Sequence, residues 1–308
     1  MTQVLVWQHG MPPLGRSVAA MGVFDGVHLG HQALVREAVG LARVRDAASV
    51  IVTFDRDPDQ VVAPTAAAAQ LLDLDQKLSL LEALGPDTVL VMPFTPELAV
   101  TAPLVFLDEV LLDVMTPVSV VVGYDFRFGH RAEGNVDTLV RYGAEHGFSV
   151  VAHDLIGLDG APITSTRIRR LVAQGDVAGA ARLLGRSHHV RGTVAHGRGE
   201  GAGLGFATAN LSTAPFAAVP ASGVYAGRVR LDRTTFPAAI SVGVPPTFPD
   251  ATADFEVHII GFDGDLYGAV LDVEFLERLR EQRAFATPAE LSQAIAHDVA
   301  RTCEIAAR

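Results

Sequence analysis

GVFDGVHLGHQALV, residues 22–35, connects an apolar strand to an amphipathic helix and decides how the first half of the chain folds. His28 and His31 are three positions apart, so both imidazoles lie on one face of the helix at its first turn. The backbone N–H groups and the helix dipole at that end favour an anion. Two imidazoles beside them suit a triphosphate that gains charge during a reaction, and Gly30 allows close approach of the backbone. A metal-ligand pair and a surface coincidence are the alternative interpretations of this spacing.

The same order of strand and helix continues to about residue 155. Apolar segments typical of buried strands alternate with segments whose apolar residues recur at helical spacing. Strands are expected at 17–24, 48–54, 87–94, 117–126 and 148–155, and helices at 31–45, 76–84, 103–115 and 135–146. This alternation predicts an α/β fold with a mostly parallel sheet and right-handed crossovers. Ligands of such sheets bind at the carboxyl ends of the strands.

The pattern changes near residue 187. Short apolar strands separated by Gly, Pro and Asp turns follow one another without helices, which predicts an antiparallel barrel or sandwich. A final helix begins after Thr287, which is its expected N-cap. We therefore expect two domains, residues 1–185 and 186–308, with His188–His189 as a polar linker near the boundary.

Composition and charge exclude several classes of protein. A formal net charge of −11 argues against extended nucleic-acid binding, which needs a basic surface. Lys77 is the only lysine, so the chain lacks the lysines of a P-loop and of a protein kinase, and phosphate binding must depend on Arg, His, backbone amides and a metal ion. Cys303 is the only cysteine and cannot form an internal disulfide. No apolar run approaches the about 18 residues of a membrane span, and the start lacks a signal-peptide pattern. We expect a cytoplasmic protein without nucleic-acid or membrane partners.

Two further polar segments lie after predicted strands of the first half, one at the end of the strand at 117–126 and one beyond the strand at 148–155. In GYDFRFGHRAEGN (123–135), Asp125 and Arg127 lie where ligands of a parallel sheet bind. In TSTRIRR (164–170), the Ser/Thr side chains cap a helix, and Arg167 offers a bidentate donor for phosphate beside the helix N-terminus. A well-packed turn and an ordinary capped surface helix are the alternative interpretations.

GxFDGxHxGHQ, GxDFxFGxxxxGN and STRIR occur in this order. Together they resemble the FAD synthetase module of bacterial bifunctional riboflavin kinase/FAD synthetases over nearly all of residues 1–185. The resemblance implies a Rossmann-like nucleotidylyltransferase domain in which the phosphate of FMN attacks the α-phosphate of ATP, giving FAD and pyrophosphate, with Mg²⁺ assisting. It implies catalytic roles for His28, His31 and Arg167. It further implies nucleotide contacts for Gly22, Phe24, Asp25, Gly30, Asp125, Arg127, Ser165 and Thr166, and flavin contacts for Phe54, Asp57 and Phe128.

VAHGRGEGAGLGFATANL (194–211) is a glycine-rich loop between two predicted strands, and such a loop can hold phosphates with backbone amides alone. Thr208 and Asn210 stand at alternate positions, so their oxygens lie on one side of an extended segment and suit Mg²⁺. Glu256, within a later strand, could take a proton from an attacking hydroxyl. A flexible hairpin and a solvated strand carboxylate are the alternative interpretations.

GFATAN is similar to the GFPTAN of riboflavin kinases, and GVYAG, SVGVPPTF, EVHIIGFDGDLYG and FLERLREQRAF follow in the order of that family over residues 188–300. The resemblance implies a six-stranded antiparallel barrel with a C-terminal helix, in which the riboflavin 5′-hydroxyl attacks the γ-phosphate of ATP. Thr208 and Asn210 would hold Mg²⁺–ATP, and Glu256 would be the base. The implied nucleotide contacts are Gly197, Gly199, Gly201 and Gly205, and the implied flavin contacts are Tyr225 and Arg280.

The sequence departs from the family pattern at a few positions. Asp57 stands where the family shows a histidine on the phosphate side. A carboxylate in its place is expected to affect the binding of FMN. Ala207 replaces a proline, and Glu200 and Ala202 replace basic residues of the loop, so we expect weaker ATP binding at the kinase site.

The expected partners are riboflavin, FMN and ATP, and the oligomeric state stays open. The alternatives to a bifunctional enzyme are an FMN adenylyltransferase with a weak or inactive kinase barrel, a flavin-sensing module, and a nucleotidylyltransferase acting on another phosphorylated alcohol.

Overall fold

The computed structural model describes residues 1–195, 206–243 and 255–308. Contacts within the chain divide it into two compact units. The first, which we call the α/β unit, comprises Met1–Ala68 and Asp73–Thr164. The second, the barrel unit, comprises Ala69–Leu72 and Ser165–Arg308.

A six-stranded parallel sheet forms the centre of the α/β unit, in the order β1-β4-β3-β2-β5-β8. Its strands are β1 (Gln3–Val6), β2 (Arg16–Met21), β3 (Ala48–Phe54), β4 (Thr88–Met92), β5 (Thr116–Gly123) and β8 (Ser149–His153). Because β2 lies between β3 and β5, the loops that follow these three strands leave the same edge of the sheet.

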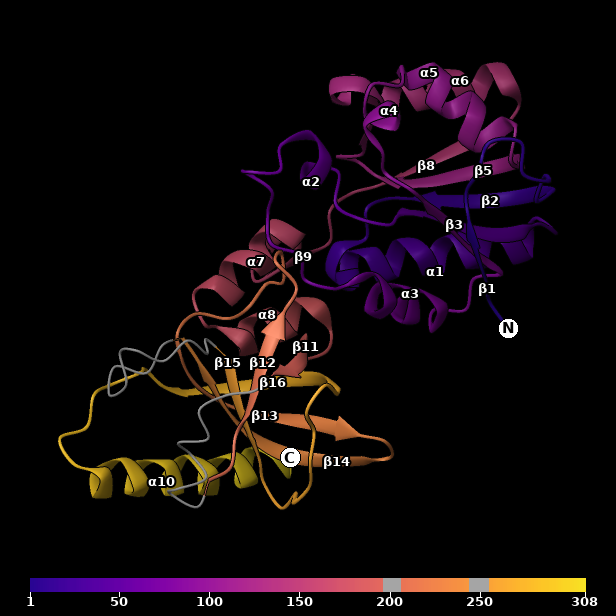
Figure 1. Ribbon diagram of the computed structural model, residues 1–308. Helices are drawn as coiled ribbons and strands as arrows, with labels where there is room; N and C mark the ends of the chain where they lie inside the picture. Colours follow the sequence, from indigo (N-terminus) through magenta and orange to yellow (C-terminus); the bar gives the residue numbers. More distant parts are fainter. Residues whose placement is uncertain (196–205, 244–254) are drawn as a thin grey trace. The chain divides into compact units, whose positions relative to one another are not determined.

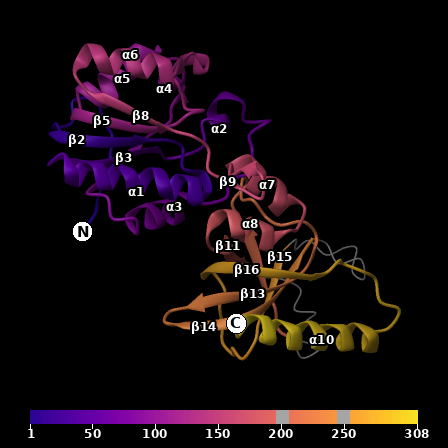
Figure 2. The same cartoon turned by 180° about the vertical axis from the view of Figure 1, so that it is seen from behind.

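Helices cover both faces of this sheet, α1 and α3 on one and α5 and α6 on the other (Figures 1 and 2). The helical segments are η1 (Asp25–Val27), α1 (Leu29–Val44), α2 (Asp59–Val62), α3 (Leu74–Glu82), α4 (Pro96–Ala99), α5 (Pro103–Leu107), η2 (Asp108–Leu112), η3 (His130–Ala132) and α6 (Val136–His146). Two short antiparallel pairs complete the unit, β6 (Arg127–Phe128) with β7 (Gly134–Asn135) and β9 (Gly157–Leu158) with β10 (Ala161–Pro162). Burial on both faces explains why the central strands read as continuous apolar runs.

The strands and helices that the sequence predicts in the first half are confirmed, although one helix is interrupted and the edge strand β1 and several short elements were not expected. The helix expected at 103–115 is α5 followed by a single π-helical turn, η2. Strand β1 was not expected, because its side chains Val4 and Val6 are 39% and 62% exposed and show no buried-strand pattern. It is an edge strand that pairs only with β4 among the described strands.

The barrel unit contains a closed antiparallel barrel in the order β11-β12-β15-β14-β13-β16. Its strands are β11 (His188–Ala195), β12 (Ala209–Thr213), β13 (Gly223–Leu231), β14 (Thr234–Val242), β15 (Phe255–Ile259) and β16 (Val270–Arg280), and its helices are α7 (Ser165–Ala173), α8 (Val177–Leu184) and α10 (Pro288–Ala306). Side chains fill the barrel interior, and Tyr225, Val257 and Phe275 are fully buried there. The predicted cap of α10 is present, since the Thr287 hydroxyl accepts the Glu290 N–H at 3.2 Å. The predicted fold class is confirmed for both halves.

The prediction that His188 and His189 form a polar linker is wrong. Both residues begin β11, and His188 is only 2% exposed. Its Nε2 lies 2.7 Å from the carbonyl oxygen of Ala218, so this contact satisfies the buried imidazole. A histidine pair is polar by type, and the sequence alone did not reveal that one ring has an internal partner.

Candidate functional site

The turn between β2 and α1 has a strained backbone. Phe24 (φ 54°), Gly26 (φ 80°) and Val27 (φ 38°) have positive φ angles. Such angles at Phe24 and Val27 cost on the order of 1–3 kcal/mol each and persist only where surrounding contacts enforce them. The Phe24 ring is 1% exposed and packs under Gly22, where an added Cβ would lie 3.2 Å from the ring. A side chain at position 22 would therefore have to displace the Phe24 ring by a few tenths of an ångström. The turn delivers His28 to the N-terminus of α1.

The two imidazoles stack at this N-terminus. Their ring centroids are 3.6 Å apart and the planes differ by 16°. His28 is the N-cap, and its Nδ1 accepts the backbone N–H of His31 at 3.3 Å. Because Nδ1 accepts this hydrogen bond, the proton of a neutral His28 ring is on Nε2. Gly30 makes room for this ring, because a Cβ there would lie 3.1 Å from His28 Cε1.

His31 is held in the neutral form. Burial, then the neighbouring His28 and then Lys77, keep the pKa of His31 well below its usual value of 6.5. Its Nδ1 is buried and makes no hydrogen bond with the described residues. An unsatisfied buried nitrogen is costly in a folded protein and is typical of a site completed by a ligand. Asp25, which precedes the pair, is also buried at 6% exposure.

The other predicted residues of the α/β unit follow the two strands that flank β2. Phe54 ends β3 and packs edge-on against Phe94, with centroids 5.3 Å apart. Asp57 is 9% exposed, and its Oδ1 accepts the Asp59 N–H at 3.1 Å in the first turn of α2.

The loop after β5 divides its predicted residues between surface and core. Asp125 and Arg127 are exposed there. Phe128 is 6% exposed and stacks on Phe126 within the apolar core, so it lies there as a packing side chain.

Ser165, Thr166 and Arg167 open α7 of the barrel unit. Thr166 is exposed, and the other two side chains are half-buried. Their expected contacts with nucleotide phosphates stay a prediction.

The predicted kinase residues of the barrel unit lie in one row across neighbouring strands. Asn210 of β12 is paired with Glu256 of β15, and Glu256 is paired in turn with Ser241 of β14. Directly paired residues of antiparallel strands point to the same face, so these three side chains line one surface. Gln282 joins the row, because its amide donates to Ser241 Oγ at 2.8 Å. The sequence reasoning missed Ser241 and Gln282, since neither residue type signals chemistry by itself.

Thr208 directly precedes β12, and a histidine holds the segment before it. His258 Nδ1 lies 2.8 Å from the Ala207 carbonyl oxygen, and its ring contacts Phe206 edge-on at 5.5 Å. His258 lies two residues after Glu256 on the same strand and therefore on the same face. This contact fixes the backbone that leads into Thr208. The remaining predicted phosphate-loop residues, together with Glu200 and Ala202, lie outside the described residues: Gly197, Gly199, Gly201 and Gly205.

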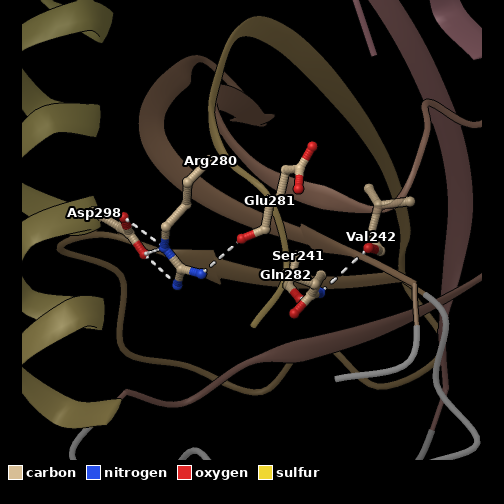
Figure 3. Close-up of polar contacts among 6 residues, drawn as sticks. All are labelled: Ser241, Val242, Arg280, Glu281, Gln282 and Asp298. Carbon is tan, nitrogen blue, oxygen red and sulfur yellow. Dashed lines mark hydrogen bonds and ion pairs between the residues drawn. The ribbon is translucent and has the colours of Figure 1, made fainter. Parts of the chain in front are cut away.

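Arg280 at the end of β16 faces α10 (Figure 3). Its guanidinium forms an ion pair with Asp298, in which Nε donates to Oδ1 at 3.2 Å and to Oδ2 at 3.0 Å, and Nη2 donates to Oδ2 at 2.8 Å. Asp298 is 4% exposed, so the arginine compensates a buried carboxylate. Both residues line a cavity of about 470 Å³ whose wall includes Phe285 and His297. Cavities of roughly 300–1,000 Å³ accommodate small organic ligands.

Tyr225, in contrast, does not line this cavity. It is fully buried in the barrel, and its hydroxyl donates to the Ala221 carbonyl oxygen at 2.5 Å.

The donor atoms fit a magnesium ion only in part. Within residues 1–195, 206–243 and 255–308, no three His, Cys, Asp or Glu side chains gather in a metal-binding arrangement. Thr208 and Asn210 offer neutral oxygens, which suit Mg²⁺ when phosphate oxygens supply the remaining ligands.

Comparisons with known proteins cover both units. The family model for FAD synthetase matches residues 12–167, and the model for riboflavin kinase matches residues 184–306. The chain is 37% identical to a bifunctional riboflavin kinase/FMN adenylyltransferase of Pseudomonas fluorescens over 97% of this chain and 96% of the relative. It is 33% identical to the Listeria monocytogenes protein of the same name, over 87% and 85%, and 30% identical to that of Bacillus subtilis, over 92% and 90%.

A solved structure also resembles the whole chain. A protein of Streptococcus pneumoniae, described as a macrolide-efflux protein, superposes with a TM-score of 0.86 at 29% identity, over 97% of this chain and 98% of that one. In the described part of this chain, no helix combines the length and apolarity needed to cross a bilayer.

Proposed function

Because the chain belongs to the bifunctional riboflavin kinase/FMN adenylyltransferase family, and makes FMN from riboflavin and FAD from FMN with ATP, we propose where each reaction takes place. Adenylyl transfer occurs at the β2–α1 turn, and phosphoryl transfer occurs at the barrel row of Asn210 and Glu256. The alternative of an adenylyltransferase with an inactive barrel is not favoured, since models for both activities match.

The stacked pair at the start of α1 carries the first assignment. A phosphate oxygen of FMN attacks the α-phosphorus of ATP, and the bond to pyrophosphate breaks, so negative charge grows on the leaving group. His28 Nε2–H and the N-terminal end of α1 stabilise that charge, and the stacked, neutral His31 lies beside them. Ser165, Thr166 and Arg167, at the start of α7, are proposed to bind nucleotide phosphate. Asp57, with its carboxylate already engaged in the turn of α2, is expected to weaken contact with the FMN phosphate.

The register of β12 with β15 carries the second assignment. Glu256 accepts the proton of the riboflavin 5′-hydroxyl as its oxygen attacks the γ-phosphorus of ATP, and ADP leaves. Thr208 and Asn210 hold Mg²⁺ together with the phosphates, and the ion supplies neutralisation of the triphosphate charge. Positioning provides most of the acceleration.

The flavin of the kinase reaction is proposed to occupy the cavity between β16 and α10. Arg280 is fixed there by Asp298, and its guanidinium carbon lies 5.6 Å from the Phe285 ring centroid. An arginine and an aromatic ring side by side suit a polar heteroaromatic ring. We further propose domains at 1–185 and 186–308 and a location in the cytoplasm.

One assay tests both assignments. The chain is incubated with ATP and Mg²⁺ and with either riboflavin or FMN, and the flavins are separated. Glu256→Gln is expected to stop FMN formation while FAD still forms from supplied FMN, and His31→Ala is expected to do the reverse. Loss of both activities in either variant, or of neither, would contradict the assignment of separate sites.

A further inference from the structure

The only lysine of the chain lies beside the proposed adenylyl-transfer site. Lys77, on α3, is 6% exposed. Its ammonium donates to the carbonyl oxygen of Phe54 at 2.6 Å and to that of Val23 at 3.3 Å. Phe54 ends β3, and Val23 directly precedes the strained turn that begins at Phe24. Lys77 thus ties the end of β3 to the start of the turn that presents His28.

A hydrogen bond alone does not require a lysine at this position. The Val23 carbonyl already accepts the Thr53 hydroxyl at 3.1 Å, so a neutral residue at position 77 would leave that oxygen with a partner. A buried ammonium is costly to desolvate, and neutral donors serve structural needs at lower cost. The hydrogen bonds of Lys77 alone therefore do not explain why a positively charged side chain is buried at this position.

The surroundings of Lys77 maintain this charge. Burial lowers the pKa of Lys77 to about 8, while Asp25, Asp57 and Asp55 act in the opposite direction. Asp25 lies within the turn, and Asp55 and Asp57 follow β3, so the ammonium sits among the carboxylates of the two loops that flank the site. Its influence reaches the imidazole pair, because the Lys77 charge contributes to the lowered pKa of His31.

We propose that Lys77 is a positioning residue of the adenylyl-transfer site, which fixes the turn that presents His28 and supplies a buried positive charge beside the two imidazoles. This inference rests on the proposed role of His28 and His31. The ammonium does not touch the substrate. It offsets the nearby carboxylates, so that the entry to α1 stays attractive to a triphosphate, and it favours the charge that leaves with pyrophosphate.

The test separates charge from hydrogen bonding. Lys77→Gln keeps a shorter N–H donor without the charge, Lys77→Met removes both, and Lys77→Arg keeps the charge. Thr53→Val is the matched control, because it removes the other hydrogen bond to Val23 and changes no charge. Steady-state constants are measured for FAD formation from FMN, and riboflavin phosphorylation by the same preparation reports on the integrity of the barrel unit.

We expect Lys77→Gln and Lys77→Met to lower kcat for FAD formation at least about 10-fold, with a smaller change in the KM of FMN. Lys77→Arg should recover part of this loss, Thr53→Val should stay within about twofold of the parent, and riboflavin phosphorylation should be unchanged in all four. A Lys77→Gln variant as active as the parent, or Lys77→Gln and Lys77→Arg variants that are equally impaired, overturns the inference. His31→Ala is run alongside: if it retains FAD formation, the proposed function of the site fails, whatever Lys77 does.

Discussion

At the scale of single residues, the adenylyl-transfer site depends on space for one imidazole. Gly30 has an ordinary helical backbone, so its role is not conformational. It matters because the His28 ring occupies the volume that a Cβ would need. Gly40, on the same helix, has no atom within 4 Å of the corresponding position. The two glycines therefore form a natural pair for testing the placement of His28.

Gly30→Ala is expected to displace the His28 ring and lower kcat/KM for FAD formation about 10- to 100-fold, since small misplacements of a catalytic group have effects of that size. Gly40→Ala should leave catalysis unchanged and stabilise α1 by up to about 1 kcal/mol. Steady-state assays and thermal unfolding of both variants check this. Equal activity of the two variants would contradict the role of the His28 position.

His188 gives the barrel a dependence on pH. Burial lowers the pKa of His188 to about 4, against the hydrogen bond to Ala218, which raises it, and the nearby His189 and Arg186 lower it further. The unfolded chain has the ordinary value of 6.5. The unfolded state thus binds more protons between these values, so the stabilising contribution is complete above pH 6.5 and is lost as the pH falls toward 4. The loss amounts to about 3 kcal/mol.

His188→Gln retains a donor for the Ala218 carbonyl and cannot be protonated. We expect the unfolding free energy of the barrel to fall less between pH 6.5 and pH 4.5 in this variant than in the parent. Denaturant unfolding, followed by far-UV circular dichroism at several pH values, measures this difference in unfolding free energy. Identical slopes in the two proteins would show that His188 is not the group responsible.

At the scale of elements, helices and strands whose apolar residues recur at regular spacing could be predicted from the sequence. Elements without such spacing could not. The central strands of the sheet, the long strands of the barrel and helices α1, α3, α6 and α10 follow from apolar spacing and caps. The π-helical turn η2 and the edge strand β1 do not, because neither changes the local pattern. The imidazole pair was predictable, since spacing and a helix start define it. Ser241, Gln282 and Lys77 were not predicted as site residues, because their places depend on strand register and tertiary contacts.

His258 on β15 illustrates how one strand supports another. Its contact with the Ala207 carbonyl holds the backbone before Thr208, at the position where the sequence lacks a proline. His258→Ala is expected to raise the KM for ATP in riboflavin phosphorylation about 10-fold, in proportion to one lost hydrogen bond. His258→Asn, which keeps a donor near Nδ1, should restore most of the affinity, and FAD formation from FMN should be unchanged. An unchanged KM in His258→Ala would contradict this role.

At the scale of the whole molecule, the side chains that carry the two assignments belong to different units. The row at Asn210 and Glu256 lies within the barrel unit, and the stacked pair of His28 and His31 lies within the α/β unit. Each chemical step should therefore survive inactivation of the other.

A mixture of Glu256→Gln and His31→Ala chains should convert riboflavin to FAD, although neither variant does so alone. FMN released by one chain is then the substrate of the other, so FAD should appear after a lag that shortens as protein concentration rises. Time courses of the separated flavins test this expectation. Absence of FAD from the mixture, with each single activity intact, would mean that FMN does not pass between chains through solution.

The burial of Lys77 within α3 also determines how the chain responds to cleavage. An endoprotease that cuts only after lysine has a single target in these 308 residues, and it lies within a helix of the α/β unit. Digestion by such an enzyme can begin only when that helix opens, so the rate at which two fragments appear measures the opening of one half of the molecule without interference from the other.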